Sequence, residues 1–264
     1  MRYLKGHGTE NDFVVLPDAD EVTLTPALVR ALCDRRAGIG ADGVLRAVRD
    51  GSLWFMDHRN ADGSVAEMCG NGIRLYARYL VDAGLAEPGR LDVVTRAGVK
   101  QVTVGRAGDV TVEMGIAKVV GTSSAAIGSH IHEGTHVDMG NPHLVCIVDG
   151  ALDAYDLSRP PSVDAAVFPE GVNLELVSPL GDRHVVMRVH ERGVGETRSC
   201  GTGAGAVAVA MARATATDAG EWLVDVPGGR LVVTLDGETV RLTGPAVMVS
   251  SGVMDAGWLA AHVG

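Results

Sequence analysis

Two cysteines of this chain lie in closely similar surroundings. Cys69 falls in residues 68–74 (MCGNGIR) and Cys200 falls in residues 199–204 (SCGTGA), 131 positions further on. In both segments glycines follow the cysteine and helix-prone residues come next, so each sulfur is predicted to lie at a helix N-terminus. Free backbone N–H groups and the helix dipole favour a thiolate there. One such thiol indicates a nucleophile, and two indicate a pair that acts together.

The similarity continues upstream of both cysteines. Residues 53–60 (LWFMDHRN) align with residues 184–191 (HVVMRVHE), so Asn60 and Glu191 each precede a cysteine by nine positions. Further matches are Asp42 with Asn173 and, within one residue, Asn11 with Asn141. Agreement in spacing at several places favours an old duplication over chance recurrence of Gly-rich turns.

Strands are expected to make up most of the elements that position these turns. The β-prone runs cover residues 52–56, 91–95, 100–104, 109–114, 144–149, 184–190, 221–226, 230–235 and 239–243, with turns at Ala107-Gly108, Gly228-Gly229 and Asp236-Gly237. Most are linked as hairpins, which predicts largely antiparallel or mixed sheets. The helix after Cys69 should end near Ala83-Gly84. Residues 204–214 are small and apolar on all sides, which predicts a helix buried inside its domain.

Composition predicts a two-domain enzyme. The 264 residues, of which 46% are hydrophobic, can fill one large core or two cores of about 120 residues each, and the repeat favours two. We expect an N-terminal half over residues 1–120, completed by residues 250–264, and a C-terminal half over residues 121–249. Residues 122–129 (TSSAAIGS) are the expected linker.

Charge and hydropathy exclude several classes of partner. A net charge of −10 argues against nucleic acid and anionic membranes. No apolar run approaches the roughly 20 residues of a membrane span, and the first residues lack a signal-peptide pattern, so we expect a cytoplasmic protein. Cys33 and Cys146 lie in apolar segments, which favours buried structural thiols.

A histidine-rich segment, HIHEGTH, invites a metal interpretation. His130 and His132 fit the alternation of an exposed strand, and no second cluster completes a coordination shell with His136. We therefore expect no metal and, because no lysine or phosphate loop stands in a suitable context, no pyridoxal phosphate or other cofactor.

Seven motifs in order along the chain resemble the diaminopimelate epimerase family. They are Asn11-Asp12-Phe13, residues 60–64 (NADGS), residues 68–72 (MCGNG), Gly140-Asn141-Pro142-His143, Val172-Asn173, Glu191-Arg192-Gly193 and residues 199–203 (SCGTG). The resemblance implies an α+β fold of two pseudo-symmetric domains, each a mixed or antiparallel sheet wrapped round a central helix, with the active site in the cleft between them. Gly43 departs from the glutamine of some members, so contact of Asp42-Gly43 with substrate stays open.

The resemblance also implies roles for individual residues. Cys69 and Cys200 would exchange protons with the α-carbon, with His143 and Glu191 taking protons from the two thiols. The residues implied in substrate binding are Gly70, Asn71, Gly201 and Thr202 around the reacting carboxylate, and Asn11, Asn60, Asn141, Asn173, Glu191 and Arg192 elsewhere on diaminopimelate. A homodimer and a small-molecule substrate follow by the same analogy.

Two cysteines suit the implied interconversion of LL- and meso-diaminopimelate, a step of lysine and peptidoglycan precursor synthesis. Inverting an α-carbon without a carbonyl cofactor requires a base on one face and an acid on the other. A thiolate and a thiol satisfy both needs and exchange roles in the reverse direction.

Other interpretations remain open at this point. Proline and hydroxyproline racemases share the two Cys-Gly turns, but they usually have histidine where this chain has Asn71. A non-catalytic thiol-disulfide protein is a further alternative, weakened by the lack of a Cys-X-X-Cys spacing. Locally, Asn141 and Asn173 are equally consistent with bonds to turn backbone, and Glu191 with Arg192 is equally consistent with a surface ion pair.

Overall fold

The computed structural model describes residues 1–17, 22–105, 108–237 and 239–263. The chain divides into two compact units: unit 1 comprises Met1–Val112 with Pro245–Gly264, and unit 2 comprises Glu113–Gly244. The sequence predicted boundaries at residues 120 and 249, whereas the structure places them within β7 (Val110–Gly115) and directly after β17 (Val240–Gly244).

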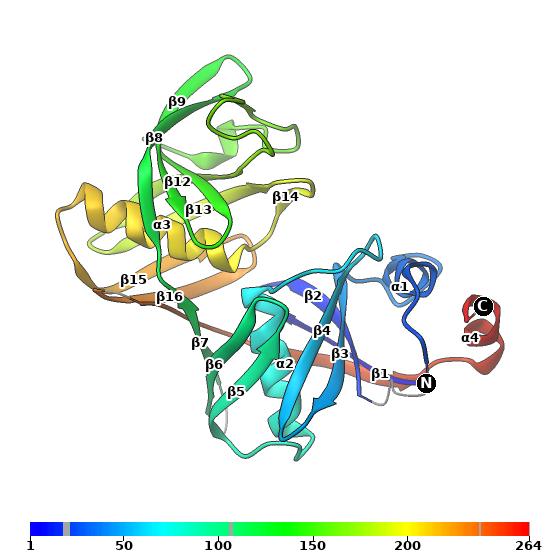
Figure 1. Ribbon diagram of the computed structural model, residues 1–264. Helices are drawn as coiled ribbons and strands as arrows, with labels where there is room; N and C mark the ends of the chain where they lie inside the picture. Colours follow the sequence, from blue (N-terminus) through cyan, green and yellow to red (C-terminus); the bar gives the residue numbers. More distant parts are fainter. Residues whose placement is uncertain (18–21, 106–107, 238, 264) are drawn as a thin grey trace. The chain divides into compact units, whose positions relative to one another are not determined.

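Unit 1 is a mixed sheet around one long helix. Its strands are β1 (Arg2–Gly8), β2 (Asn11–Leu16), β3 (Gly43–Asp50), β4 (Leu53–Asn60), β5 (Gly89–Thr95), β6 (Gly98–Val104) and β18 (Val247–Val253). The pairing order is β18-β1-β2-β3-β4-β5-β6, parallel only for β2–β3 and β4–β5 among these pairs. Helix α2 (Gly70–Asp82) contacts β1, β2, β3, β4 and β6 (Figure 1). Helices α1 (Pro26–Cys33) and α4 (Ala256–His262) also lie in contact, so the C-terminal segment completes this unit.

Unit 2 has the same arrangement as unit 1, a mixed sheet around one long helix. Its elements are β8 (Lys118–Ile127), β9 (His130–Asp138), β10 (Pro142–Ile147), the short 3-10 helix η2 (Leu152–Ala154), β11 (Ser162–Val163), β12 (Asn173–Gly181), β13 (His184–Glu191), β14 (Gly195–Thr197), α3 (Gly201–Ala214), β15 (Ala219–Val226), β16 (Gly229–Asp236) and β17. The order β8-β9-β10-β12-β13-β15-β16-β17 is again parallel only at two pairs, β10–β12 and β13–β15. In Figure 1, α3 lies within this set of strands.

Strand register shows how closely the two units correspond. Phe13 pairs with Gly43 in unit 1, and His143 pairs with Asn173 in unit 2. The strand ends also correspond: β3 and β12 begin at Gly43 and Asn173, and β4 and β13 end at Asn60 and Glu191. By these ends the counterpart of Asn173 is Gly43, one residue after the Asp42 of the sequence alignment. The α+β class and the two-domain organisation with central helices are confirmed.

The central helices differ in the way they are buried. Helix α2 contains charged residues, yet eleven of its thirteen residues are buried, among them Arg74. Helix α3 is built mostly from alanine, glycine and valine, and the strands approach it closely on nearly every side. The prediction of a buried, small-residue helix is confirmed, and it begins at Gly201, three residues earlier than expected.

Two further sequence predictions have clear outcomes. The linker expected at residues 122–129 is wrong, because β8 covers most of it and pairs with β9. Ala125 and Ile127 are buried in the core of unit 2, so this part of the segment belongs to the sheet. Cys33 and Cys146 are buried, as predicted. The turn expected at Ala107-Gly108 falls partly outside the described residues, and no helix among those described is long and apolar enough to cross a membrane.

Candidate active site

Both repeated cysteines cap a helix. Cys69 is the N-cap of α2, and its sulfur accepts a hydrogen bond from Gly72 N at 3.4 Å. Cys200 is the N-cap of α3, and its sulfur accepts from Gly203 N at 3.3 Å. The prediction that each sulfur lies at a helix N-terminus is confirmed. The N–H groups of the first helical turn have no partner within the helix, so both caps offer donors for an anion.

Amide side chains surround Cys69, which is partly exposed. Its thiol donates to Asn11 Oδ1 at 3.5 Å, and Asn71 Nδ2 donates to the same oxygen at 3.4 Å. Asn71 Oδ1 accepts from Thr9 Oγ1 at 3.2 Å, and the buried guanidinium of Arg74 donates to that hydroxyl at 3.0 Å. The site thus has a cation and several neutral hydrogen-bonding groups beside a thiol that solvent can reach.

Carboxyl groups surround Cys200, which is buried. Burial raises the pKa of this thiol well above its ordinary value, and the charges of Glu191 and Glu175 raise it further. Thr202 Oγ1 lies 3.4 Å from the sulfur. The sequence-based expectation of a favoured thiolate is therefore wrong for Cys200, because desolvation and two acids outweigh the helix N-terminus. These surroundings favour the thiol form of Cys200, which is a proton donor.

Glu191 is the acid nearest to Cys200. Thr197 Oγ1 donates to its Oε1, and a hydrogen bond also joins Glu191 to Cys200. Burial raises the pKa of the Glu191 carboxyl, with the charge of Glu175 adding to the effect. A carboxyl with a raised pKa in contact with a thiol is suited to exchange a proton with it.

His143 is completely buried between two side chains. Its Nδ1 lies 2.7 Å from Glu175 Oε1, and its Nε2 lies 3.1 Å from Asn141 Oδ1. Since Asn141 Nδ2 donates to Thr202 Oγ1 at 3.5 Å, the Asn141 oxygen faces the histidine and Nε2 carries a hydrogen. Burial raises the pKa of the Glu175 carboxyl, and the charge and hydrogen bond of His143 act in the opposite direction.

Asn173 and Arg192 are linked through backbone. Asn173 is buried, its Nδ2 donates to Pro142 O at 3.0 Å, and its Oδ1 accepts from Arg192 N at 3.0 Å. This is the turn-bracing interpretation left open for Asn173. The guanidinium of Arg192 lies 3.5 Å from Glu170 Oε2 rather than on Glu191, so the surface ion pair suggested between residues 191 and 192 is not the arrangement observed.

Asn60 lies at the exposed end of β4. Its Nδ2 donates to Ser64 Oγ at 3.0 Å and its backbone N–H donates to Ser64 O at 3.0 Å, which closes a turn. Thus the structure groups Asn11 and Asn71 with Cys69. In unit 2 it groups His143, Asn141, Glu191 and Thr202 with Cys200, whereas the hydrogen bonds of Asn60 go to Ser64, and Asn60 pairs with Gly43 next to Asp42.

Sequence reasoning missed Glu175, Thr197 and the role of Asp42 as a partner of Asn11. A weak signal existed for Glu175, because it is an acid within the apolar run of β12 (NLELV) and an acid buried in a strand needs a partner. Nothing local marked Thr197, which reaches Glu191 across the β13–β14 hairpin.

The described residues show no group of three or more His, Cys, Asp or Glu side chains arranged to hold a metal ion. His130 and His132 stack at 6.3 Å on β9, and both face Tyr155. The two histidines, two residues apart on β9, thus lie on one face of the strand and form a cluster of rings with Tyr155.

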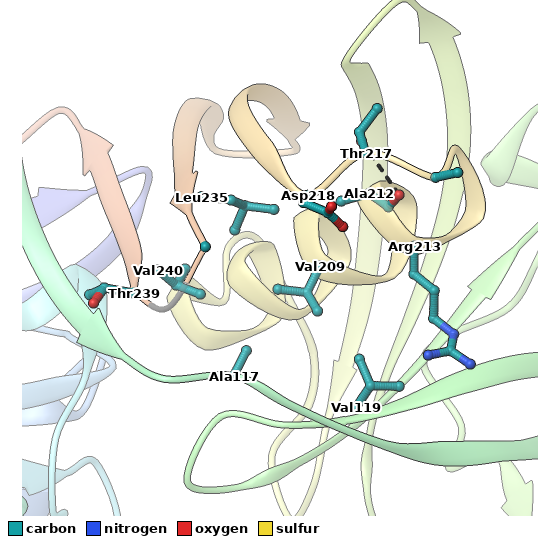
Figure 2. Close-up of a pocket in the computed structure, with 12 residues that line it drawn as sticks. Ala117, Val119, Val209, Ala212, Arg213, Thr217, Asp218, Leu235, Thr239 and Val240 are labelled. Carbon is teal, nitrogen blue, oxygen red and sulfur yellow. Dashed lines mark hydrogen bonds between the residues drawn. The ribbon is translucent and has the colours of Figure 1, made fainter.

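Two cavities lie in unit 2. One of about 350 Å³ is at the C-terminal end of α3, where Val209, Arg213, Leu235 and Val240 line it (Figure 2). Cys200 caps the opposite end of this helix, so the cavity is separate from the thiol. The other, of about 500 Å³, is lined in part by Arg192, Glu170 and His190.

The chain resembles curated proteins along nearly its whole length. The family model for diaminopimelate epimerase matches residues 3–120 and 135–249. A diaminopimelate epimerase of Streptomyces coelicolor is 53% identical over 281 residues, covering 98% of this chain and 97% of that protein. One of Rhodococcus jostii is 48% identical over 284 residues, covering 98% of each.

Solved structures share the fold at low identity. A phenazine biosynthesis protein of the PhzF family from Bacillus anthracis superposes with a TM-score of 0.73 at 16% identity, covering 97% of this chain and 99% of that one. A hydroxyproline epimerase from Agrobacterium vitis has a TM-score of 0.67 at 16% identity, covering 99% and 98%. These likenesses establish the architecture alone. The family model and the curated relatives show more: the chain belongs to the diaminopimelate epimerase family of isomerases.

Proposed function

We propose that this protein interconverts LL- and meso-diaminopimelate by two-base proton transfer with no cofactor, in the synthesis of lysine and peptidoglycan precursors. The observation that carries the proposal is the N-capping cysteine at the corresponding position of each unit, combined with family membership. Two acid–base thiols are the number that inversion of one carbon requires.

The reaction divides between the thiols. The thiolate of one cysteine removes the α-proton, and the electron pair left on carbon delocalises into the adjacent carboxylate. The thiol of the other cysteine then delivers its proton to the opposite face, which inverts the centre. In the reverse direction the two cysteines exchange roles.

The helix N-termini stabilise the intermediate. The N–H groups of Gly70 and Asn71, and those of Gly201 and Thr202, lie in the first turns of α2 and α3. Such donors stabilise negative charge as it develops on the reacting carboxylate. Glu191, in hydrogen-bonding contact with Cys200, returns that thiol to its required protonation state after each turnover.

The remaining binding residues fit the far end of a long, doubly zwitterionic substrate. Arg192 lines a cavity and supplies a planar fork of donors suited to a carboxylate. Asn11, Asn60 and Asn173 add neutral hydrogen-bonding groups, and Asn141 binds nearer to Cys200, where it is hydrogen-bonded to Thr202. We further propose a cytoplasmic homodimer, an inference from the family resemblance that light scattering of the purified protein tests.

Incubation in D2O tests the function directly. LL-diaminopimelate with the purified, metal-free protein should lose its α-proton NMR signal to deuterium while the meso isomer forms. L-proline and trans-4-hydroxy-L-proline should show no exchange under the same conditions. Exchange with proline but not diaminopimelate would replace the proposal with a racemase, and no exchange with any of the three would exclude both.

A further inference from the structure

The side chain of Asn11 lies between a carboxylate and the Cys69 thiol. Its Nδ2 donates to Asp42 Oδ2 at 2.8 Å. On the other side, its Oδ1 accepts from the Cys69 thiol at 3.5 Å and from Asn71 Nδ2 at 3.4 Å. Both polar ends of the amide therefore have partners, and these partners differ in what they can offer.

Asp42 determines which way the amide faces. An ionised carboxylate accepts hydrogen bonds and cannot donate one, so Asn11 must turn its NH2 group towards Asp42. Its carbonyl oxygen then faces the sulfur of Cys69. The NH2 group of Asn71 points at the same oxygen, which agrees with this orientation.

A network of ion pairs and hydrogen bonds holds the Asp42 carboxylate in place. Arg35 Nη2 lies 2.6 Å from Asp42 Oδ1, and the backbone N–H of Asp12 donates to Asp42 Oδ2 at 3.2 Å. Arg35 also forms a bidentate pair with Asp12, at 3.0 and 2.8 Å, and Lys5 donates to Asp12 as well. The positive charges of Lys5 and Arg35 thus offset the negative charges of Asp12 and Asp42. These contacts hold Asp42 where it accepts a hydrogen bond from Asn11.

We propose that Asp42 is a positioning residue for Cys69: by fixing the orientation of the Asn11 amide, it aims a hydrogen-bond acceptor at the sulfur and favours the thiol over the thiolate. Two neighbouring groups act the other way. Gly72 N donates to the sulfur, and the buried cation Arg74 attracts a negative charge there. The Asn11 oxygen opposes both, which keeps a proton available on Cys69.

The value of this arrangement for catalysis rests on the proposed function. Epimerisation requires one cysteine to be protonated whenever the other is a base. Without Asp42, the Asn11 amide is free to turn its NH2 group towards the sulfur, and a donor in that place stabilises the thiolate. The balance between the two protonation states at Cys69 then shifts, even though Asp42 touches neither the sulfur nor a substrate.

The test is the pH dependence of Cys69 alkylation in the intact protein, measured with iodoacetamide and peptide mapping. Asp42→Asn keeps the size of the side chain but offers an NH2 group, so Asn11 no longer has a fixed orientation. We expect the apparent pKa of Cys69 to fall by roughly half a unit to one unit, because one hydrogen bond changes from acceptor to donor.

Two further variants separate positioning from simple loss of charge. Asp92→Asn removes an exposed carboxylate on β5 of the same unit and should leave the profile unchanged. Asn11→Ala deletes the acceptor while leaving the Asp42–Arg35 pair, so it should lower the apparent pKa by itself. Adding Asp42→Asn to Asn11→Ala should then produce no further shift.

Three results would overturn the proposal. They are an unchanged profile in Asp42→Asn, an unchanged profile in Asn11→Ala, and an equal shift from Asp42→Asn whether or not Asn11 is present. The last would show that Asp42 acts on Cys69 through its charge alone. Alkylation needs no substrate, so these outcomes are distinct from failure of the epimerase proposal, which the deuterium-exchange experiment detects.

Discussion

The two cysteine sites share a backbone plan and differ in their electrostatics. Each sulfur caps a helix and accepts an N–H from the third residue after it. Cys69 is partly exposed among amides and a cation, whereas Cys200 is buried beside two acids. A duplicated frame thus supplies the same geometry twice, and the residues added around it set the proton affinity of each thiol separately.

This difference fits a reaction that needs an acid and a base together. In a symmetric site both thiols would titrate alike, and no neighbour would select which one holds the proton. Glu191 beside Cys200 and Asn11 beside Cys69 occupy non-equivalent places in the two units, so the two thiols have different hydrogen-bonding partners.

Removing either sulfur leaves a single acid–base thiol and should abolish the activity. Cys69→Ala and Cys200→Ala are each expected to reduce turnover by roughly 10⁴-fold, the upper end for an acid–base group, because each thiol serves one face of the carbon. Cys33→Ala is the control, since burial raises the pKa of that thiol to about 12. Steady-state assays with circular dichroism test this, and turnover within tenfold of wild type in either active-site variant contradicts the two-base mechanism.

Glu191→Gln should remove the feature that most distinguishes the second site. We expect turnover to fall about 100-fold, because the group that exchanges a proton with Cys200 is lost. At the same time the pKa of Cys200 should fall, because a negative neighbour that raises it has gone. Turnover and the pH profile of Cys200 alkylation measure the two effects. Glu196→Gln, whose carboxylate pairs with Arg188 on the same hairpin, should change neither.

The native thiols should react in a fixed order. At pH 8 iodoacetamide should modify Cys69 at least about tenfold faster than Cys200, because burial and two acids hold the pKa of Cys200 well above its ordinary value. Peptide mapping over time gives both rates from one sample. Faster modification of Cys200 would show that the buried, acid-rich description of its site is wrong.

The backbone elements that carry both cysteines were predictable from sequence, whereas the side chains that surround each sulfur were predicted only in part. Cysteine, glycine and a helix-prone run are local signals, and they located both N-caps and the two central helices. The duplication gave the strands before each cysteine. Residues 122–129 misled the prediction because serine, threonine and alanine suit a linker and a half-exposed strand equally well.

What the sequence could not supply is pairing across the sheets. Glu175 reaches His143 because β10 and β12 run parallel with adjacent registers, and Asp42 reaches Asn11 through the parallel pair β2 and β3. Neither contact follows from spacing along the chain. The high pKa of Cys200 depends on burial, which the motif surrounding it does not encode.

The smallest effects should come from a methyl group placed at equivalent points of the two helices. Gly203 and Gly72 each follow a capping cysteine by three residues. A Cβ at Gly203 would lie 2.7 Å from Glu175 Oε1, which is fixed by its bond to His143. Gly203→Ala should therefore lower the free energy of unfolding by about 1–3 kcal/mol, the usual effect of overpacking a filled core.

Gly72→Ala is the matched control for Gly203→Ala. Its Cβ would meet Leu45 and Phe13 no closer than 3.4 Å, an ordinary van der Waals distance, so the better helix propensity of alanine should leave stability unchanged or raise it by up to about 1 kcal/mol. Urea unfolding of both variants gives the difference. Since the two substitutions are chemically identical, equal destabilisation would mean that any side chain is rejected at this turn. A loss confined to Gly203→Ala would instead place the constraint in the carboxyl of Glu175, which stands against this helix turn where the first site has Leu45.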